Sequence, residues 1–346
     1  MDRIEAKVVI TETSAATGYD AVRNGGAGLI DLSERGRILI SGTEAVMFLN
    51  GLITNDMKTL AVNSWMPAVF PNVQGRLLAA VRVIHRDDGF LIDTESATRE
   101  TVVKLLERFT LAGDFRLADL SEDTALLSIQ GANAPAIVAA IFGETAARLG
   151  RDAVASVDWQ GKQLTIIRAT HTAEDGFDLF VNATEADGLR EAFIKAGAQP
   201  IGTDTIETLR IEAGIARYCV DMDETNVVTE TNLDDAVSFT KGCYVGQEII
   251  ARIKYRGHVA KKLTGLTFES EVSLETGAKI CSSDDKDIGR VTSFAFSPRL
   301  NRTIALGYVK YDCLAAGTKV KAEVGGRQYS ASVAELPFVR GSWYSI

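Results

Sequence analysis

The pattern of hydrophobic positions changes along the chain near residues 257–262. Before this point, short apolar runs alternate with segments in which apolar residues recur every three or four positions, the spacing of an amphipathic helix. Val102, Leu105, Leu106 and Phe109 form one such stripe. After this point there are only short alternating runs separated by turn residues, as in half-buried strands. The chain is therefore expected to form a mixed body followed by an all-β domain.

The body is predicted to contain two successive cycles of strands and helices. Asn133 and Pro135 are expected to open a helix as N-cap and first residue, and Gly197 to close another. Strands and helices mix without strict βαβ alternation, so the α+β fold class is favoured over a doubly wound sheet. The predicted strands cover residues 37–40, 77–84, 90–93, 126–130, 163–168 and 177–181, and further helices cover 43–50, 205–216 and 244–253.

The C-terminal part is predicted to be a small β-barrel or sandwich. Gly325-Gly326 is a strong signal for a tight hairpin between its last two strands. The predicted strands cover residues 262–268, 279–281, 290–296, 304–310, 319–324 and 328–333.

Composition narrows the class of protein. With 346 residues, 46% of them hydrophobic, the chain is long enough for two or three cores, and its net charge of −9 argues against general nucleic-acid binding. The start of the chain lacks the apolar core of a signal peptide, and no apolar run approaches the ~18 residues that span a bilayer. The protein is expected to be cytoplasmic, without membrane contact.

The four cysteines, at positions 219, 243, 281 and 313, form no C-x-x-C pair. A metal or cluster site made by this chain alone is not expected, and neither is a disulfide framework. The thiols are expected to be free.

One segment, KGCYVGQEIIA at residues 241–251, carries most of the chemical information. Cys243 is expected at the start of the 244–253 helix, where unpaired backbone N–H groups and the helix dipole favour the thiolate. A lone cysteine is more often a small buried thiol. Here Lys241 adds a positive charge and two glycines give close backbone access, so Cys243 and Lys241 are the predicted reactive pair.

Two other features have both a structural and a functional interpretation. Residues 241–262 carry six basic residues and one acidic, 6 − 1 = +5, directly after an acidic run at 219–235. The basic stretch is either a solvated surface or an attractor for carboxylates or phosphates. Likewise, Glu174 lies either in an ordinary turn or at a strand end where it pairs with the N–H donors of a flat heterocycle.

The motif KGCYxGQE at residues 241–248 closely resembles the signature of the YgfZ family. These proteins are folate-binding relatives of the glycine-cleavage T-protein and are linked to iron–sulfur cluster assembly or repair. Three other segments, at residues 48–56, 209–215 and 231–233, resemble further motifs of this family, which the wider superfamily shares. The resemblance implies a folate-binding body of two α+β, ferredoxin-like subdomains over residues 1–245 and a C-terminal β-barrel over 258–346.

The resemblance also implies a ligand, tetrahydrofolate or a one-carbon folate, and residues that bind it. Glu174-Asp175-Gly176 matches the turn in which a T-protein glutamate binds the pterin, with Ala173 in place of the first glycine. Glu174 is therefore expected to contact the pterin. Arg210 is a further candidate for the same pocket, and Tyr244 and Gln247 of the signature are candidate folate contacts. The charge of the basic stretch, rather than the resemblance, suggests Arg252 and Arg256 for the glutamate tail.

One departure from the T-protein pattern decides the expected function. Ala79 and Ala80 stand where T-proteins carry an Asp pair, and an alanine methyl can neither hold a proton nor stabilise an iminium. T-protein-type aminomethyl transfer is therefore not expected. The main expectation is a folate-binding accessory factor for iron–sulfur cluster assembly or repair that uses Cys243.

Iron–sulfur enzymes or assembly proteins are the expected partners, because one cysteine cannot hold a cluster alone. Two alternatives stay open. One is a folate-dependent one-carbon transferase, either an aminomethyltransferase or a demethylase. The other is a folate-binding scaffold in which Cys243 is inert.

Overall fold

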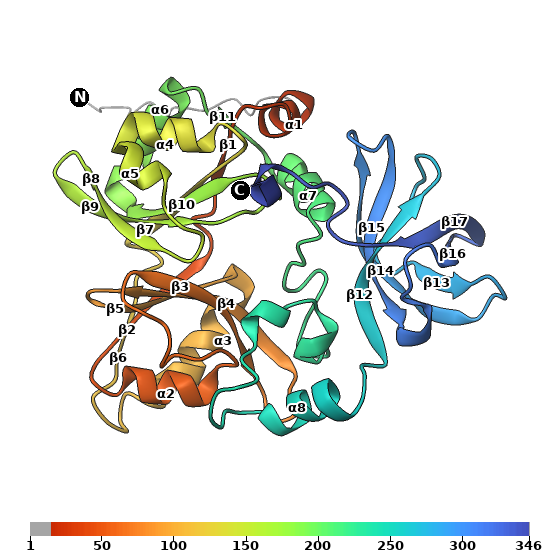
Figure 1. Cartoon of the computed structure of the whole chain (residues 1–346), viewed down its shortest axis with the longest axis horizontal. Helices are drawn as coiled ribbons and strands as arrows, with labels where there is room; N and C mark the ends of the chain where they lie inside the picture. The colour runs from red at the N-terminus through yellow and green to blue at the C-terminus, as the bar shows by residue number, and fades with distance from the viewer. Residues whose placement is uncertain (1–14, 346) are drawn as a thin grey trace, which may run out of the picture.

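The computed structural model describes residues 15–345, so the segment at the start of the chain on which the signal-peptide argument depends lies outside it. Three parts surround a centre: two α+β subdomains on one side and a β-barrel on the other (Figure 1). The helices are α1 (Ala15–Arg23), α2 (Ala45–Leu52), α3 (Ser96–Glu107), α4 (Ala134–Phe142), α5 (Glu144–Ala147), α6 (Ala186–Lys195), α7 (Thr203–Glu212) and α8 (Gln247–Arg256).

The first subdomain contains a five-stranded sheet covered by α2 and α3. Val81 and Val83 of β4 pack with Leu49 of α2 and Val102 and Leu106 of α3 in its core. The apolar stripe at 102–106 thus lies on a helix and faces the core, as its spacing predicts. In sheet order the strands are β3 (Ser64–Pro71), β4 (Leu77–Arg86), β5 (Gly89–Thr94), β2 (Gly36–Ser41) and β6 (Arg116–Asp119).

The second subdomain contains a six-stranded sheet with α4 and α6 packed on it. Its β1 comes first along the chain but pairs with β7, so the two subdomains interleave in sequence. Leu127, Ile137 and Phe193 are buried in its core. In sheet order the strands are β11 (Gln199–Pro200), β1 (Gly28–Asp31), β7 (Thr124–Gln130), β10 (Gly176–Asn182), β9 (Lys162–Arg168) and β8 (Val154–Trp159).

The two sheets face one another across a shared apolar layer. Ile84 and Leu91 of the first sheet meet Leu126, Ile167 and Phe180 of the second. A row of ion pairs crosses the same boundary, Arg35–Asp93, Arg82–Asp93 and Arg82–Asp178. The His171 ring also contacts Asp178, at 3.0 Å.

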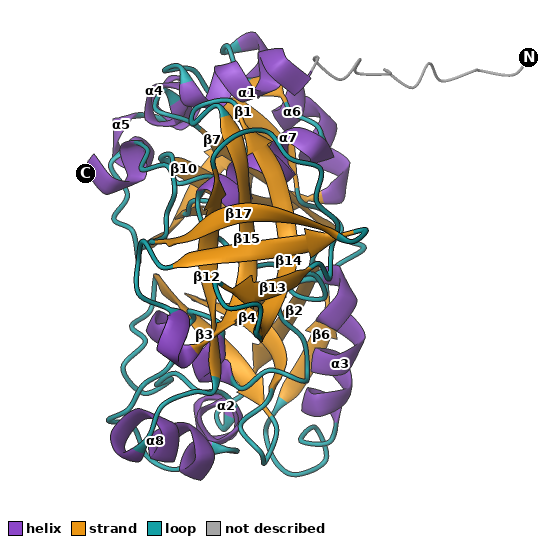
Figure 2. Ribbon diagram, turned by 90° about the vertical axis from the view of Figure 1, so that its right-hand side faces the viewer, coloured by secondary structure: helices purple, strands orange, loops and turns teal. Residues whose placement is uncertain are grey.

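The barrel is closed, as Figure 2 shows from its side. Gly325 and Gly326, at φ +56° and +77°, form the tight turn between its last two strands. The predicted α+β body and C-terminal barrel are therefore confirmed. In barrel order the strands are β12 (Lys261–Phe268), β15 (Arg302–Lys310), β14 (Asp287–Ser297), β13 (Lys279–Ser282), β16 (Lys319–Val324) and β17 (Arg327–Ala334).

Two local expectations are wrong. Helix α7 ends at Glu212 rather than at 216, because Gly214 takes a left-handed conformation at φ +70°. Helix α8 begins at Gln247 rather than at 244, because Gly246 is left-handed at φ +76°. Asn133 is the N-cap of α4, as expected, and Pro135 lies in the first turn, although the Asn133 side chain makes no capping hydrogen bond. Within residues 15–345, no helix combines the length and the apolar character that crossing a bilayer requires.

Candidate functional site

Lys241 anchors the loop that carries Cys243. The side chain is buried, and its Nζ donates to the carbonyl oxygens of Asn50, Ile53 and Asn55 at 2.8, 2.9 and 2.6 Å. These carbonyls lie at the end of α2 and in the turn after it. Burial lowers the pKa of Lys241 to about 8. Lys241 thus fastens the loop to α2, and its ammonium is directed at these carbonyls.

The neighbours of Lys241 brace the same loop. Tyr244 is buried among Leu77 and Ile250, its ring lies 5.1 Å from the Lys241 Nζ, and burial raises the pKa of Tyr244 to about 12. At Gly246 a Cβ atom would lie 2.4 Å from the Asn72 carbonyl oxygen, so only glycine fits. Gln247 Nε2 donates to the Gly242 carbonyl at 3.4 Å.

Cys243 is exposed on this braced loop. The expectation that it stands at a helix N-terminus is wrong, because the left-handed Gly246 is the N-cap of α8 and Cys243 precedes it by three residues. Cys219 is a second exposed thiol, whereas Cys281 is buried. The loop therefore presents the Cys243 sulfur to solvent without placing it in the first turn of the helix.

Glu174 is held by the C-terminal segment of the chain. Its Oε1 accepts from Arg23 of α1 at 2.9 Å, and its Oε2 accepts from the backbone N and the Oγ of Ser342, both at 2.7 Å. A Cβ atom at Gly341 would lie 2.3 Å from Oε1, so the backbone of residue 341 closes over the carboxylate. Contact with a pterin remains a prediction, and it requires residues 341–342 to move.

Arg210 is similarly occupied. Its guanidinium donates to Asp221 at 2.7 Å, to the carbonyl oxygen of Ile215 at 3.0 Å and to Glu207. These two carboxylates raise the pKa of Arg210 against the opposing effect of burial. Its visible role is to fasten α7 to the segment that follows it.

Ala79 and Ala80 point to opposite faces of β4. Ala79 is fully buried in the core of the first subdomain. Ala80 is half-buried and lies on the other face, with the cluster that includes Tyr218 and Tyr244. Of the two positions, only residue 80 lies where a carboxylate would reach the centre of the molecule.

A cavity of about 690 Å³ lies where the body meets the barrel and the C-terminal segment. Residues 213–216, after α7, and residues 231–235 form one side. The other side consists of β12 and of residues near the end of the chain, Leu314, Ala316, 334–337 and Tyr344. Its ionisable lining groups are Asp234, Asp235, Glu335 and Lys262. Sequence reasoning missed the carboxylates as site residues, although two family-like motifs, at 209–215 and 231–233, border the cavity.

The predicted site residues do not converge. Helix α8, with Arg252 and Arg256, lies at the lower end of Figure 1, whereas Glu174 contacts α1 at the upper end. Neither Cys243 nor Glu174 lines the cavity. From the basic stretch at 252–262, Lys262 reaches it, at 3.4 Å from Asp234.

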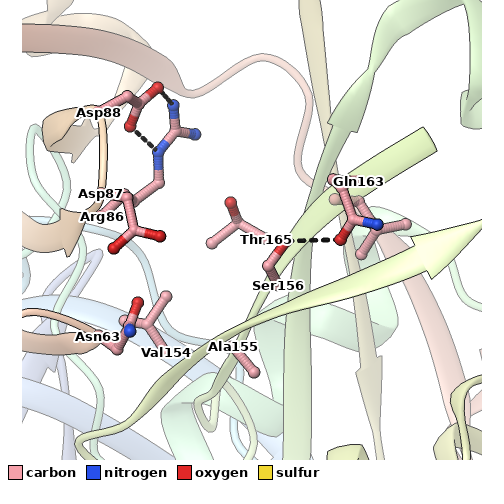
Figure 3. A pocket seen from close by; sticks show the side chains of 10 residues that line it. Asn63, Arg86, Asp87, Asp88, Val154, Ala155, Ser156, Gln163 and Thr165 are labelled. Atoms are coloured by element: carbon pink, nitrogen blue, oxygen red, sulfur yellow. Dashed lines mark hydrogen bonds and ion pairs between the residues drawn. The ribbon is translucent and has the colours of Figure 1, made fainter.

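A separate pocket of about 270 Å³ lies between the β4–β5 turn and the β8–β9 hairpin (Figure 3). Arg86 pairs there with Asp88, and Gln163 accepts from Ser156 at 2.8 Å. It holds none of the predicted site residues. Among the described residues, no group of three or more His, Cys, Asp or Glu side chains is arranged to hold a metal ion.

Comparison with known proteins gives consistent matches over nearly the whole chain. Residues 9–241 match the GCVT N-terminal domain and residues 261–340 the glycine cleavage T-protein C-terminal barrel domain. An aminomethyltransferase of Rubrobacter xylanophilus is 31% identical over 93% of this chain and 85% of its own length. One from Thermus thermophilus is 30% identical over 94% and 91%.

A solved structure shares the fold. The glycine cleavage system aminomethyltransferase T of Bartonella henselae superimposes with a TM-score of 0.86 at 24% identity, over 94% of this chain and 90% of that one. The match includes both the body and the barrel.

Proposed function

Because this chain belongs to the family of the glycine cleavage T-protein, we propose that it binds a folate and that its working group is the Cys243 thiol. In this proposal it supports the assembly or repair of iron–sulfur enzymes, as its YgfZ-like signature suggests. No carboxylate occupies positions 79 and 80, where its transferase relatives would need one.

The observation that carries the proposal is the construction of the Cys243 loop. The Lys241 ammonium donates hydrogen bonds to three carbonyls, and Tyr244 is buried. Gly246 permits a close contact with the Asn72 carbonyl that no other residue allows. Burying a lysine is costly and is tolerated only when its donors are satisfied. The loop is thus held in place by several independent contacts while Cys243 stays exposed.

The cavity beside the barrel fits a folate in size and in chemistry. At about 690 Å³ it lies within the range of roughly 300–1,000 Å³ typical of small-molecule sites. Asp234 and Asp235 offer acceptors for pterin N–H groups, and Lys262 offers a charge for a tail carboxylate. When bound, a folate supplies a carrier for one-carbon units.

One-carbon transfer is the second candidate, and the names of the relatives favour it. The face of β4 that carries Ala80 argues against it, because general acid–base catalysis needs a titratable group in reach of the reacting atoms. Arg82 lies two residues further along the same face of β4, and the two carboxylates that contact it, Asp93 and Asp178, are buried in ion pairs with it.

Calorimetry with tetrahydrofolate tests ligand binding. The wild type should bind, and Asp235→Asn or Lys262→Gln should weaken binding about tenfold, the effect of losing one charged contact. Asp187→Asn, at an exposed acid on α6, is the matched control and should bind as the wild type does. The proposed cavity is wrong if both cavity variants keep wild-type affinity.

An assay of methylene transfer from an aminomethyl donor to tetrahydrofolate separates the two candidate functions. The proposal predicts no turnover above the uncatalysed rate. Turnover by the wild-type protein would establish the second candidate and overturn the first.

A further inference from the structure

Helix α8 has an outward face with the composition of a protein-binding surface. Arg252, Tyr255 and Arg256 lie three and four residues apart and so share one side of the helix. Ile250, on the opposite side, is fully buried. Tyr255 is 66% exposed although it is a large aromatic residue. Tyr and Arg are the residue types most concentrated at interface hot spots.

The Cys243 loop leads directly into this helix, because Gly246 at the end of the loop is the N-cap of α8. The turn at residues 72–75 packs against Gly246 and Ile250, so it supports the buried side of α8 rather than the outward one. We call the Cys243 loop together with Arg252, Tyr255 and Arg256 the α8 surface. Both views place α8 at the outer edge of the molecule (Figures 1 and 2).

The charge of α8 opposes that of the whole protein. Its ten residues carry Arg252, Lys254 and Arg256 against Glu248, 3 − 1 = +2, in a chain of net charge −9. The one internal pair, Arg252–Glu248, is long at 3.3 Å and exposed, so it neutralises little. A local positive patch on an acidic protein selects partners that are negatively charged at the contact.

We propose that the α8 surface docks an acidic polypeptide segment of a partner protein and brings it beside Cys243. The inference rests on the proposed function only for the role of the thiol. Charge complementarity identifies the partner class, and the exposed ring of Tyr255 provides an apolar anchor.

An anionic membrane and a nucleic acid fit this surface less well than an acidic polypeptide. A membrane-bound helix buries its apolar side in lipid, but here that side, with Ile250, is packed against the protein. A nucleic acid would meet the acidic remainder of the chain outside a small patch, whereas general binders carry an extended basic face. A polypeptide with a short acidic segment needs only the patch.

The test uses fluorescein-labelled poly-L-glutamate as the probe and fluorescence anisotropy as the measurement. The wild type should bind with an affinity that falls as salt rises. Arg252→Gln combined with Arg256→Gln should weaken binding about tenfold, as expected for two partly exposed ion pairs. Arg302→Gln combined with Arg327→Gln, two exposed arginines of the barrel, is the matched control and should bind normally.

A second readout locates the bound probe. Saturating poly-L-glutamate should slow alkylation of Cys243 by iodoacetamide and leave alkylation of the other exposed thiol, Cys219, unchanged. Phosphatidylglycerol vesicles, duplex DNA and pentaglutamyl tetrahydrofolate are run in parallel. The proposal is overturned if Arg252→Gln combined with Arg256→Gln weakens binding of one of these ligands but not of poly-L-glutamate. It is also overturned if both double variants weaken binding of poly-L-glutamate equally, or if Cys243 is not protected from alkylation.

These outcomes are independent of the proposed function. Failure of poly-L-glutamate to bind would refute the docking surface. Tetrahydrofolate binding and the requirement for Cys243 are tested by separate experiments and would be unaffected.

Discussion

Replacing Lys241 by methionine tests whether this residue is the anchor of the Cys243 loop. Methionine keeps the length and apolar stem of the side chain but donates no hydrogen bond. The carbonyls of Asn50 and Ile53 would lose a buried donor, at about 1–3 kcal/mol each. The Asn55 carbonyl is part-exposed and can bind water instead.

An opposing effect comes from the charge of Lys241. Its pKa falls from 10.5 to about 8 on folding, so holding the ammonium in the folded protein near neutral pH costs about 1.36 kcal/mol for each unit, roughly 3 kcal/mol. Methionine removes this cost, and the net loss of stability at about pH 7 is therefore expected to be near 1 kcal/mol.

The pH dependence follows from the direction of the shift. Between about pH 8 and 10.5 the unfolded chain binds the Lys241 proton and the folded protein does not, so wild-type stability rises with pH in this window. Lys241→Met lacks this gain. The stability gap between wild type and variant should widen by up to about 3 kcal/mol from pH 7 to pH 10.

Urea unfolding at both pH values measures the gap. Lys58→Met, at an exposed lysine close in sequence to the three carbonyls, is the control and should show a small, constant gap. Alkylation of Cys243 should also become faster in Lys241→Met, because the loop loses its anchor. A gap that stays constant or narrows with pH, together with an unchanged alkylation rate, would refute the anchoring role.

Two further predictions concern β4 and the N-cap of α8. Ala79→Asp should lower the free energy of unfolding by about 3 kcal/mol or more, because it places a carboxylate in an apolar core, whereas Ala80→Asp should lower it by less than about 1 kcal/mol. Thermal unfolding compares the two variants. Equal losses would contradict the assignment of the two faces. Gly246→Ala should lower the free energy of unfolding by about 2–3 kcal/mol, because residue 246 has a positive φ and lies against the Asn72 carbonyl. Gly257→Ala, at an open extended position, should leave it nearly unchanged. Urea unfolding measures both variants, and equal stabilities would contradict this account.

The strands and helices with strong periodicity could be predicted from sequence. The strand at 126–130 and the stripe at 102–106 lie in the structure where they were expected, and Gly325-Gly326 forms its hairpin turn. Strand β3 was missed because Pro67 and Pro71 interrupt its pattern, yet it pairs with β4 along its length. Its pairing partner, rather than its own sequence, makes it a strand.

The site was less predictable because its parts come together only through long-range contacts. The signature at 241–248 predicts Cys243 as a site residue, but nothing local shows that Lys241 binds carbonyls almost two hundred residues away. Nor could local sequence show that Ser342, near the end of the chain, donates two hydrogen bonds to the carboxylate of Glu174. The cavity likewise depends on how the barrel docks on the body.

The most direct test of the account is the activity of an iron–sulfur enzyme in cells that lack this protein and carry one of two cysteine variants. Cys219→Ser changes an exposed thiol outside the signature loop and should restore activity fully. Cys243→Ser keeps the size of the side chain but removes the sulfur, and it should not restore activity. Full restoration by Cys243→Ser would contradict the claim that the loop exists to present this thiol.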